Sequence, residues 1–315
     1  EKTSARRWQN MLGWLLVNHE TLAEPSIQTI IALINKMGVN IRTVDVSEVQ
    51  VICEPGDSQH CFIAGEAVAV PDFSLSAFFG GNNYHSKAVV KMLEALNVLC
   101  VNSSESLNNT ADKLLTFQKL GAAEQGFLFP KTVLMTPKTK PSFIASELGL
   151  PCVVKVMHGS KGKGVVLIKT EKELENILDL YAAMNFDDHI LIQECIAASK
   201  GRDMRIMLSG GKFSTAYIRD NGDNFKSNLS QGGELQFITP PAEVIAIAED
   251  AAAVLDIYFG SIDFLFGEND SYYICEANSM TGLTYSKDAL SNTESNPLLL
   301  TLKNIMVEAQ KRKQK

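Results

Sequence analysis

Residues 152–169 read CVVKVMHGSKGKGVVLIK, and the interpretation of the whole chain starts from this stretch. Two apolar runs flank a loop rich in glycine and lysine, which predicts a strand, a loop and a second strand. Walker A and dinucleotide-binding loops both need a helix after the glycines, so neither is indicated. The N–H groups of such a hairpin loop can instead cover phosphates as a flap, with Lys155 adding a positive charge. An ordinary surface hairpin is the alternative, and this stretch alone does not separate the two.

Before this stretch, the chain has the pattern of a small α/β domain with a βαβ opening. The strands are expected over 12–17, 39–44 and 97–102, and the helices over 27–37 and 87–96. A polar stretch at 102–105 follows the last strand. We therefore expect a first domain over residues 1–104.

Residues 105–315 are expected to form a second domain of mixed strands and helices, with residues 129–192 as a subdomain that carries the glycine loop. The helices are expected over 111–120, 140–148, 171–184 and 242–255. The strands are expected over 130–134, 152–157, 165–169 and 189–195, as a pair between 203 and 219 that turns at Gly210-Gly211, and as a hairpin over 261–266 and 271–277.

Composition limits the class of protein. The chain has 315 residues, 45% of them hydrophobic, and a net charge of -7, which argues against a broad nucleic-acid-binding face. Its six cysteines form no C-x-x-C pair and are expected to be reduced core residues of a cytoplasmic protein. The apolar run Met11–Val17 is too short to cross a bilayer, so no membrane partner is expected.

The hairpin near the C-terminus carries candidate metal ligands. Side chains alternate along a strand, so Ile274, Glu276 and Asn278 are predicted to share one face, with Asp263 on the paired strand. Carboxylate and amide oxygens suit Mg²⁺, which keeps most of its waters and is completed by substrate phosphates. The alternative is the polar, solvent-facing side of an edge hairpin, which the neighbouring apolar residues disfavour.

Two further features lie between the glycine loop and this hairpin. Arg205 and Arg219 lie on neighbouring strands, where they can hold a carboxylate or a transferring phosphoryl group, or form surface salt bridges. Residues 193–196 end a strand, and such an end can present a carboxylate and backbone groups to adenine or ribose.

Seven motifs follow one another along the chain. They are Lys113, Val153-Val154-Lys155-Val156 with the glycine loop, Gln193-Glu194, Asp203-Met204-Arg205, Phe225-Lys226-Ser227-Asn228, Ile262-Asp263 and Glu276-Ala277-Asn278. In order and spacing they resemble the RimK-like branch of the ATP-grasp ligases over about residues 98–290. Each motif alone is weak evidence, but seven in register are not.

The resemblance implies an α/β (α+β) chain: an ATP-grasp fold over 105–315, preceded by a small N-terminal α/β domain, the pre-ATP-grasp domain. It implies ATP and Mg²⁺ as cofactors, with two metal ions expected and Mn²⁺ as a substitute. ATP would be held between the lid, which is the subdomain over residues 129–192, and the C-terminal sheet. The residues implied to bind ATP are Lys113, Lys155, Gly159, Ser160, Gly162, Gly164, Gln193, Glu194, Cys195 and Ile196. Those implied to bind metal are Asp263, Glu276 and Asn278, and those implied to face the reacting phosphate and carboxylate are Arg205, Arg219 and Asn228.

The activity implied by the resemblance is that of a ligase. It would activate a carboxylate as an acyl phosphate, join it to an amine and release ADP and phosphate. By family habit it would add an amino acid such as glutamate to a peptide, a cofactor or a carrier protein. One alternative is a graspetide-type ligase that closes lactams or esters in a precursor peptide. Another is a nucleotide-binding regulatory protein without turnover, against which the complete set of metal ligands argues.

The chain also departs from the family. Lys226 stands where the family commonly has arginine, and Thr281 replaces a common proline. Both lie near the substrate side, so the identity of the amine is affected more than the ATP site. The first hundred residues resemble the family only in pattern, and residues 79–85 form either a substrate loop or a turn. Neither a monomer nor a homo-oligomer is excluded.

Overall fold

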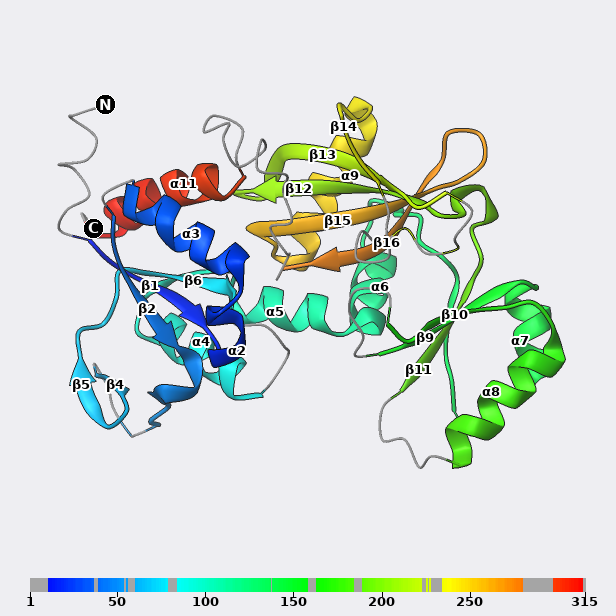
Figure 1. The fold of residues 1–315 in the computed structure, drawn as a ribbon, viewed down its shortest axis with the longest axis horizontal. Coiled ribbons are helices and arrows are strands. Elements are labelled where there is room, and N and C mark those ends of the chain that lie inside the picture. Colours follow the sequence, from blue (N-terminus) through cyan, green and yellow to red (C-terminus); the bar gives the residue numbers. More distant parts are fainter. Residues whose placement is uncertain are drawn as a thin grey trace.

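The computed structural model describes residues 11–36, 39–53, 55, 60–78, 84–136, 138–157, 163–183, 189–222, 225, 227, 234–279 and 297–313. Figure 1 shows a parallel sheet at one end of the molecule, a five-stranded antiparallel sheet above and beside it, and a smaller antiparallel sheet at the other end. The mixed α/β class predicted from the sequence is confirmed. No helix in these ranges combines the length and apolar character that a membrane span requires.

The parallel sheet contains the first strand, whose residues Trp14 to Val17 are fully buried. Trp14 and Leu16 pack with residues of helix α4 (Tyr84–Ala95) on one face, while Leu15 and Val17 pack with Ile34 of helix α3 (Pro25–Lys36) on the other. A strand covered on both faces needs an uninterrupted apolar run, as found here. The strand order is β2 (Asn40–Asp45), β1 (Leu12–Val17), β6 (Phe73–Phe78) and β7 (Leu99–Val101), and a small antiparallel sheet beside them consists of β3 (Val49–Gln50), β4 (Cys61–Ile63) and β5 (Glu66–Val68).

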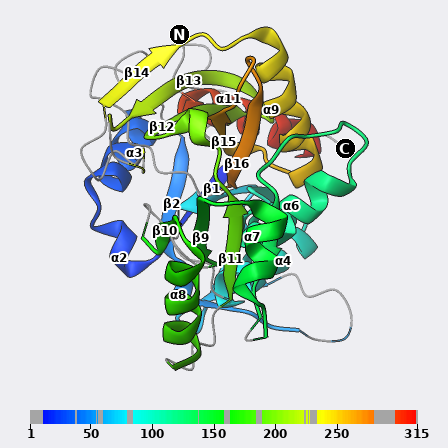
Figure 2. The ribbon, with the colours of Figure 1, turned by 90° about the vertical axis from the view of Figure 1, so that its right-hand side faces the viewer.

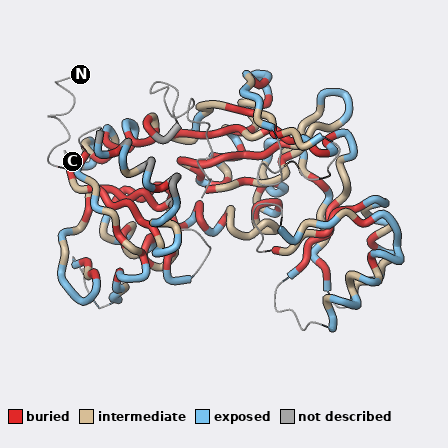
Figure 3. Tube along the Cα trace, in the orientation of Figure 1, coloured by how far each residue is buried: buried red, intermediate tan, exposed pale blue. Residues whose placement is uncertain are grey.

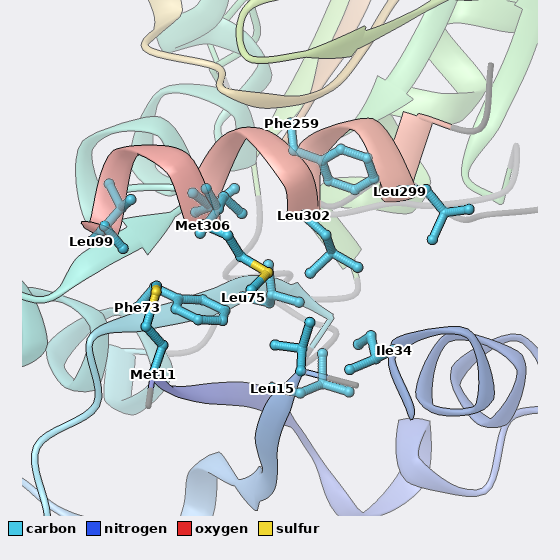
Figure 4. Close-up of a cluster of buried hydrophobic side chains, with 14 of the residues drawn as sticks. Met11, Leu15, Ile34, Phe73, Leu75, Leu99, Phe259, Leu299, Leu302 and Met306 are labelled. Carbon is cyan, nitrogen blue, oxygen red and sulfur yellow. The ribbon is translucent and has the colours of Figure 1, made fainter. Parts of the chain in front are cut away.

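The last helix, α11 (Pro297–Lys313), completes the core of this first sheet. Leu302 and Met306 of this helix are buried in the same cluster as Leu15, Phe73 and Leu75, as Figure 4 shows. The two ends of the described chain therefore share one hydrophobic core. The domain division at residues 104 and 105 stays a prediction.

The four-stranded sheet at the far end forms the region expected to be the lid. Strands β9 (Cys152–Val156) and β10 (Val165–Ile168) pair in an antiparallel register that sets Lys155 opposite Val165, so the two predicted strands are confirmed; residues 158–162 between them lie outside the described residues. Cys152, Val154 and Ile192 face helices α7 (Pro141–Leu148) and α8 (Glu171–Ala183), which lie on the outer side in Figure 2. The order is β10, β9, β11 (Ile190–Glu194) and β8 (Thr132–Leu134).

The five-stranded antiparallel sheet lies between these two regions, and helix α9 (Ala242–Leu255) covers one of its faces. Gly210 and Gly211, both at positive φ, form the turn predicted between its two central strands. The order is β14 (Glu234–Ile238), β13 (Lys212–Asp220), β12 (Arg202–Ser209), β15 (Phe259–Phe266) and β16 (Tyr272–Asn278). Strand β14 was not predicted from the sequence.

One predicted helix is wrong in its bounds. In place of a single helix over 111–120, the structure has α5 (Ser104–Ala111) and α6 (Lys113–Ala122), separated by Asp112. The Asp112 carboxylate accepts hydrogen bonds from the N–H groups of Leu114 and Leu115, so it caps a new helix at this point. Lys113 therefore lies at the very start of α6.

Candidate active site

One face of the five-stranded sheet is charged and the other is apolar. Asp203 and Arg205 alternate with Met204 and Ile206 along β12, and Asp263 on β15 pairs directly with Arg205. The apolar side chains of the opposite face pack with α9; they include Met204, Ile206, Leu208, Ile262, Phe264, Ile274 and Ala277. Because α9 covers only that face, the charged residues can approach the neighbouring regions of the molecule.

The arginines and aspartates of the charged face form a continuous network. Arg205 binds Asp263 with two hydrogen bonds, Nε to Oδ1 at 2.7 Å and Nη2 to Oδ2 at 2.6 Å. Arg219 binds Asp203 in the same way, with both distances 2.6 Å, and its Nη2 also reaches Asp263 Oδ2 at 2.8 Å. The Ser227 hydroxyl donates to Asp203 Oδ2 at 2.6 Å. Neither arginine forms the exposed surface salt bridge that was the sequence-based alternative.

Burial and pairing act in opposite directions on these groups. Burial alone would lower the pKa of Arg205 and of Arg219, but the carboxylates beside them hold each pKa above its ordinary value. Burial alone would raise the pKa of Asp263, but the positive charges of both arginines hold it below its ordinary value. Arg205, Arg219 and Asp263 are therefore charged at neutral pH.

The predicted metal ligands lie together at one edge of this face. Asp263 pairs with Glu276, and Asn278 follows two residues later on the same strand. Three of the four lone-pair positions of the Asp263 carboxylate accept from arginine N–H groups, which leaves one on Oδ1. The Asn278 Nδ2 atom is buried without a hydrogen-bond partner among the described residues, and the two ends of an amide are interchangeable in assignment. Two carboxylates and an amide oxygen fit Mg²⁺.

Two further observations concern the predicted metal ligands and the strand face on which they lie. In the described part of the chain, no three His, Cys, Asp or Glu side chains gather as a metal cluster. The predicted face is also wrong for Ile274, which lies in the apolar core with Ala277. The pairing of β15 and β16 shifts by one residue at Cys275, because a β-bulge interrupts the alternation there.

Both predicted phosphate-binding lysines reach β16, the strand that carries the predicted metal ligands Glu276 and Asn278, from other elements. Lys113 Nζ lies 3.8 Å from Glu276 Oε1 and donates to the Met157 carbonyl at 3.2 Å. Lys155 Nζ, from the lid sheet, lies 3.6 Å from Cys275 Sγ. The lysines and Glu276 are thus close enough to share one triphosphate. Cys275 was not predicted at the site; its position there follows from the bulge.

The predicted nucleoside-binding residues lie at the end of β11. Gln193 is buried and donates to Thr132 Oγ1 at 2.8 Å, while its Oε1 has no hydrogen-bond partner among the described residues. Glu194 Oε1 accepts from the Lys131 N–H at 2.9 Å. Cys195 and Ile196 are partly exposed. Gln193 shares a sheet face with Leu191, which pairs with Lys155, so a nucleotide that contacts Lys155 could extend along this face. Their roles in binding stay predictions.

Some predicted site residues lie outside the described residues. These are Gly159, Ser160, Gly162, Asn228, Lys226, Thr281 and the segment 79–83. Gly164 is described: its φ is +72°, and a Cβ there would come within 2.4 Å of a Val156 methyl group. Only glycine fits that position, because both the backbone and the available space exclude a side chain.

The sequence reasoning missed the partners of the arginines. Asp203 was quoted only as part of a motif and Ser227 was given no role, yet both bind within the network. The signal for Asp203 was its position two residues before Arg205, which puts both side chains on one face of a strand. Its pairing with Arg219 depends on the register of β12 and β13, which no local pattern gives.

Comparisons with known proteins agree with this geometry. A family model described as the RimK-like ATP-grasp domain matches residues 110–296, more than half of the chain. A protein named probable alpha-L-glutamate ligase from Vibrio atlanticus is 31% identical over 221 residues, which cover 70% of this chain and 72% of that protein.

Solved structures share the fold. The D-alanine-D-alanine ligase from Coxiella burnetii matches with a TM-score of 0.70 at 17% identity, covering 97% of both chains. The ATP-grasp ligase PsnB, complexed with a minimal precursor, Mg and ADP, matches with a TM-score of 0.68 at 15% identity, covering 95% of this chain and 98% of that one. The chain therefore has the ATP-grasp fold, belongs to the RimK-like ATP-grasp family, and is an amide-bond-forming ligase.

Proposed function

We propose that this ligase phosphorylates a carboxylate with Mg-ATP and joins the resulting acyl group to an amine, with release of ADP and phosphate. The observation that carries the proposal is the convergence of Lys113 from α6 and Lys155 from the lid sheet on the strand that holds Glu276. Two cations and a carboxylate from three separate elements can surround one polyphosphate and its metal ion.

Each group would have a defined task. Lys113 and Lys155 would bind phosphate oxygens, and Asp263, Glu276 and Asn278 would hold Mg²⁺, two ions being our expectation. The metal would neutralise charge that develops on the transferred phosphoryl group. Arg205 and Arg219 would add fixed positive charge beside it, already oriented by Asp203 and Asp263.

The proposed reaction has two steps, phosphoryl transfer to the carboxylate and attack of the amine on the acyl phosphate. A carboxylate oxygen of the substrate attacks the γ-phosphorus of ATP, and the bond from that phosphorus to the bridging oxygen of ADP breaks. The amine nitrogen then attacks the acyl carbon, phosphate leaves with the bonding electron pair, and the nitrogen loses a proton. Since water would hydrolyse the acyl phosphate, closure of the hairpin that carries Gly164 would protect it.

The amine is proposed to be an amino acid, with glutamate first, because the relatives at about 30% identity are named probable alpha-L-glutamate ligases. The acceptor would be a carboxylate of a peptide, a cofactor or a carrier protein. Glutamate would place its own carboxylates near a face that already carries Arg205 and Arg219.

A screen of amino acids against candidate carboxylates tests the proposal. The purified protein with Mg-ATP is expected to release ADP and phosphate only with the correct pair, and mass spectrometry should show the acceptor heavier by one glutamyl residue. AMP and pyrophosphate as products would rule out the acyl-phosphate route. A peptide that instead loses one water would identify the chain as a ligase that closes rings within its substrate.

A further inference from the structure

A buried asparagine outside the network of arginines and aspartates connects the first sheet to β16, the strand that carries the predicted metal ligands Glu276 and Asn278. Asn102 follows β7 and is completely buried. Its Nδ2 donates to the carbonyls of Phe259 at 2.6 Å and Ser279 at 2.5 Å. Its Oδ1 accepts from the N–H groups of Tyr258 at 3.0 Å and Phe259 at 2.8 Å. An asparagine amide offers two donors and two lone pairs, so every hydrogen-bonding position of this side chain is used.

These four bonds fix the ends of the two strands that carry the predicted metal ligands. Phe259 begins β15, which leads to Asp263, and Ser279 directly follows Asn278 at the end of β16. The two strand ends also approach closely at Gly260, where a Cβ would lie 2.2 Å from the Asn278 carbonyl oxygen. The backbone of Asn278 is therefore held by the glycine contact on one side and by Asn102 through Ser279 on the other.

Helix α5 makes a second contact with Ser279, through Thr110. The hydroxyls of Thr110 and Ser279 lie 2.6 Å apart, and Thr110 Oγ1 also donates to the Ser106 carbonyl at 2.9 Å. A hydroxyl has one proton, so Ser279 must be the donor to Thr110. Three residues after Thr110, Lys113 lies 3.8 Å from Glu276. Residues 102–113 thus contact the metal-binding strand near both Asn278 and Glu276.

We propose that Asn102 is a positioning residue for the metal site, acting on Asn278 through Ser279 and supported by Thr110. This inference rests on the proposed function, because it requires Asn278 to bind the metal. Residues that orient metal ligands without touching the metal change its affinity by about 10- to 100-fold when they are replaced. Loss of the Asn102 amide should therefore raise the Kd for the metal while the protein still folds.

Asn109 provides the matched control. It is a buried asparagine, its Nδ2 donates to the Leu255 carbonyl at 3.2 Å, and so it connects α5 to the end of α9 rather than to β16. Asn102→Ala and Asn109→Ala each remove one buried amide from the same part of the chain. The four bonds lost at Asn102 reach the ends of β15 and β16, whereas the bond lost at Asn109 reaches the end of α9, so the Mn²⁺ affinity of each variant is compared with its own free energy of unfolding.

The experiment is a Mn²⁺ titration, followed by electron paramagnetic resonance, of the full chain with a non-hydrolysable ATP analogue. Asn102→Ala is expected to raise the Kd for Mn²⁺ about tenfold or more, and Asn109→Ala less than about threefold. Excess Mg²⁺ should restore turnover to Asn102→Ala, which a general loss of structure would not allow. An unchanged Kd in Asn102→Ala, or equal increases in both variants, would overturn the inference.

A milder variant decides the question if Asn102→Ala does not fold. Thr110→Val keeps the shape of the side chain and removes two hydrogen bonds of its hydroxyl, the one with Ser279 and the one to the Ser106 carbonyl within α5. A raised Kd for Mn²⁺ in this variant supports the inference, and an unchanged Kd overturns it.

Failure of the proposed function would look different. If wild type binds no Mn²⁺ with the nucleotide, or Glu276→Ala binds it as well as wild type, the metal site itself is wrong and both proposals fall. If wild type binds Mn²⁺, Glu276→Ala does not, and Asn102→Ala behaves as wild type, only the positioning role fails.

Discussion

The parallel sheet and the five-stranded antiparallel sheet differ in the side chains that cover their faces. The parallel sheet is covered by α3 and α11 on one face and by α4 on the other, so the four residues Trp14 to Val17 are all buried. The five-stranded sheet is covered by α9 on one face; on its other face α11 packs at the end that holds Ser209 and Phe259, and the same face carries the network of Arg205 and Asp263. Figure 3 shows the buried strands of both sheets. In the five-stranded sheet the charged side chains gather on the face that α9 does not cover, and four changes test whether the two sheets differ in this way.

The largest effect should come from the charged face. Glu276→Ala removes a predicted metal ligand, so we expect kcat to fall about a thousandfold, a loss of about 4 kcal/mol in transition-state stabilisation. The Glu276 side chain is 36% exposed, so its loss should leave the melting temperature close to that of wild type. Coupled ADP-release kinetics and thermal melting measure the two quantities.

The control for this change is Glu234→Ala. Glu234 is an exposed carboxylate on β14, the edge strand of the same sheet, and its replacement should leave kcat near that of wild type. Equal losses of kcat in the two variants would remove Glu276 from the metal site.

The next effect concerns stability within the network. Asp203→Asn breaks the buried ion pair of Arg219 with Asp203 and leaves Asp263 as the one carboxylate that both arginines of the network share. Breaking a buried ion pair costs about 3–5 kcal/mol in the free energy of unfolding. Urea denaturation should show this loss. Asp220→Asn, in the exposed pair with Arg202 on the same two strands, should cost less than about 1 kcal/mol. Similar costs for the two variants would show that the Asp203 pair is not buried in solution.

A core change in the parallel sheet should separate stability from catalysis. Leu15→Ala leaves a cavity between α3 and α11, which should cost about 3 kcal/mol in the free energy of unfolding. The folded fraction should keep the kcat of wild type, because Leu15 takes no part in the network of arginines and aspartates. A loss of kcat that exceeds the loss of folded protein would contradict the division of tasks between the sheets.

The smallest effect is a pH dependence that belongs to the parallel sheet. Burial raises the pKa of the Cys100 thiol to about 12 from its ordinary value of 9.0. Because the pKa of Cys100 is higher in the folded than in the unfolded protein, its contribution to the free energy of unfolding is complete below pH 9. That contribution is lost as the pH rises toward 12. Between pH 8 and pH 10, wild type should lose about 1 kcal/mol more than Cys100→Ala. Urea denaturation at both pH values measures this difference, and equal losses would show that Cys100 does not contribute.

Local pattern was sufficient for much of the fold. The strands β9 and β10 on either side of the glycine-rich loop, the helices α7, α8 and α9, and the late hairpin of β15 and β16 were predicted within a few residues. Each of these elements is specified by the periodicity of its own side chains and by the glycines at its ends. Asp112 shows the limit of this approach, since one capping side chain divided what appeared to be a continuous helical stretch.

The candidate site was predicted as a set of residues but not as an arrangement. Lys113, Lys155, Asp263 and Glu276 could be named from their order along the chain. The bulge at Cys275, the pairing of Asp203 with Arg219 and the bonds of Asn102 could not be. Asn102 binds Phe259 across 157 residues of sequence.

The sequence by itself determined most of the segments that form strands and helices, though not β14 or the break at Asp112, and it put Asp203 with Arg205 on one face of a strand. Side-chain alternation and turn chemistry act between near neighbours, so they can be read locally. Only the tertiary structure decided that α11 returns to the first sheet and that Asn102 holds the end of β16. Such contacts depend on strand register and on the packing of whole elements, which arise from the combined burial of many residues far apart in the chain.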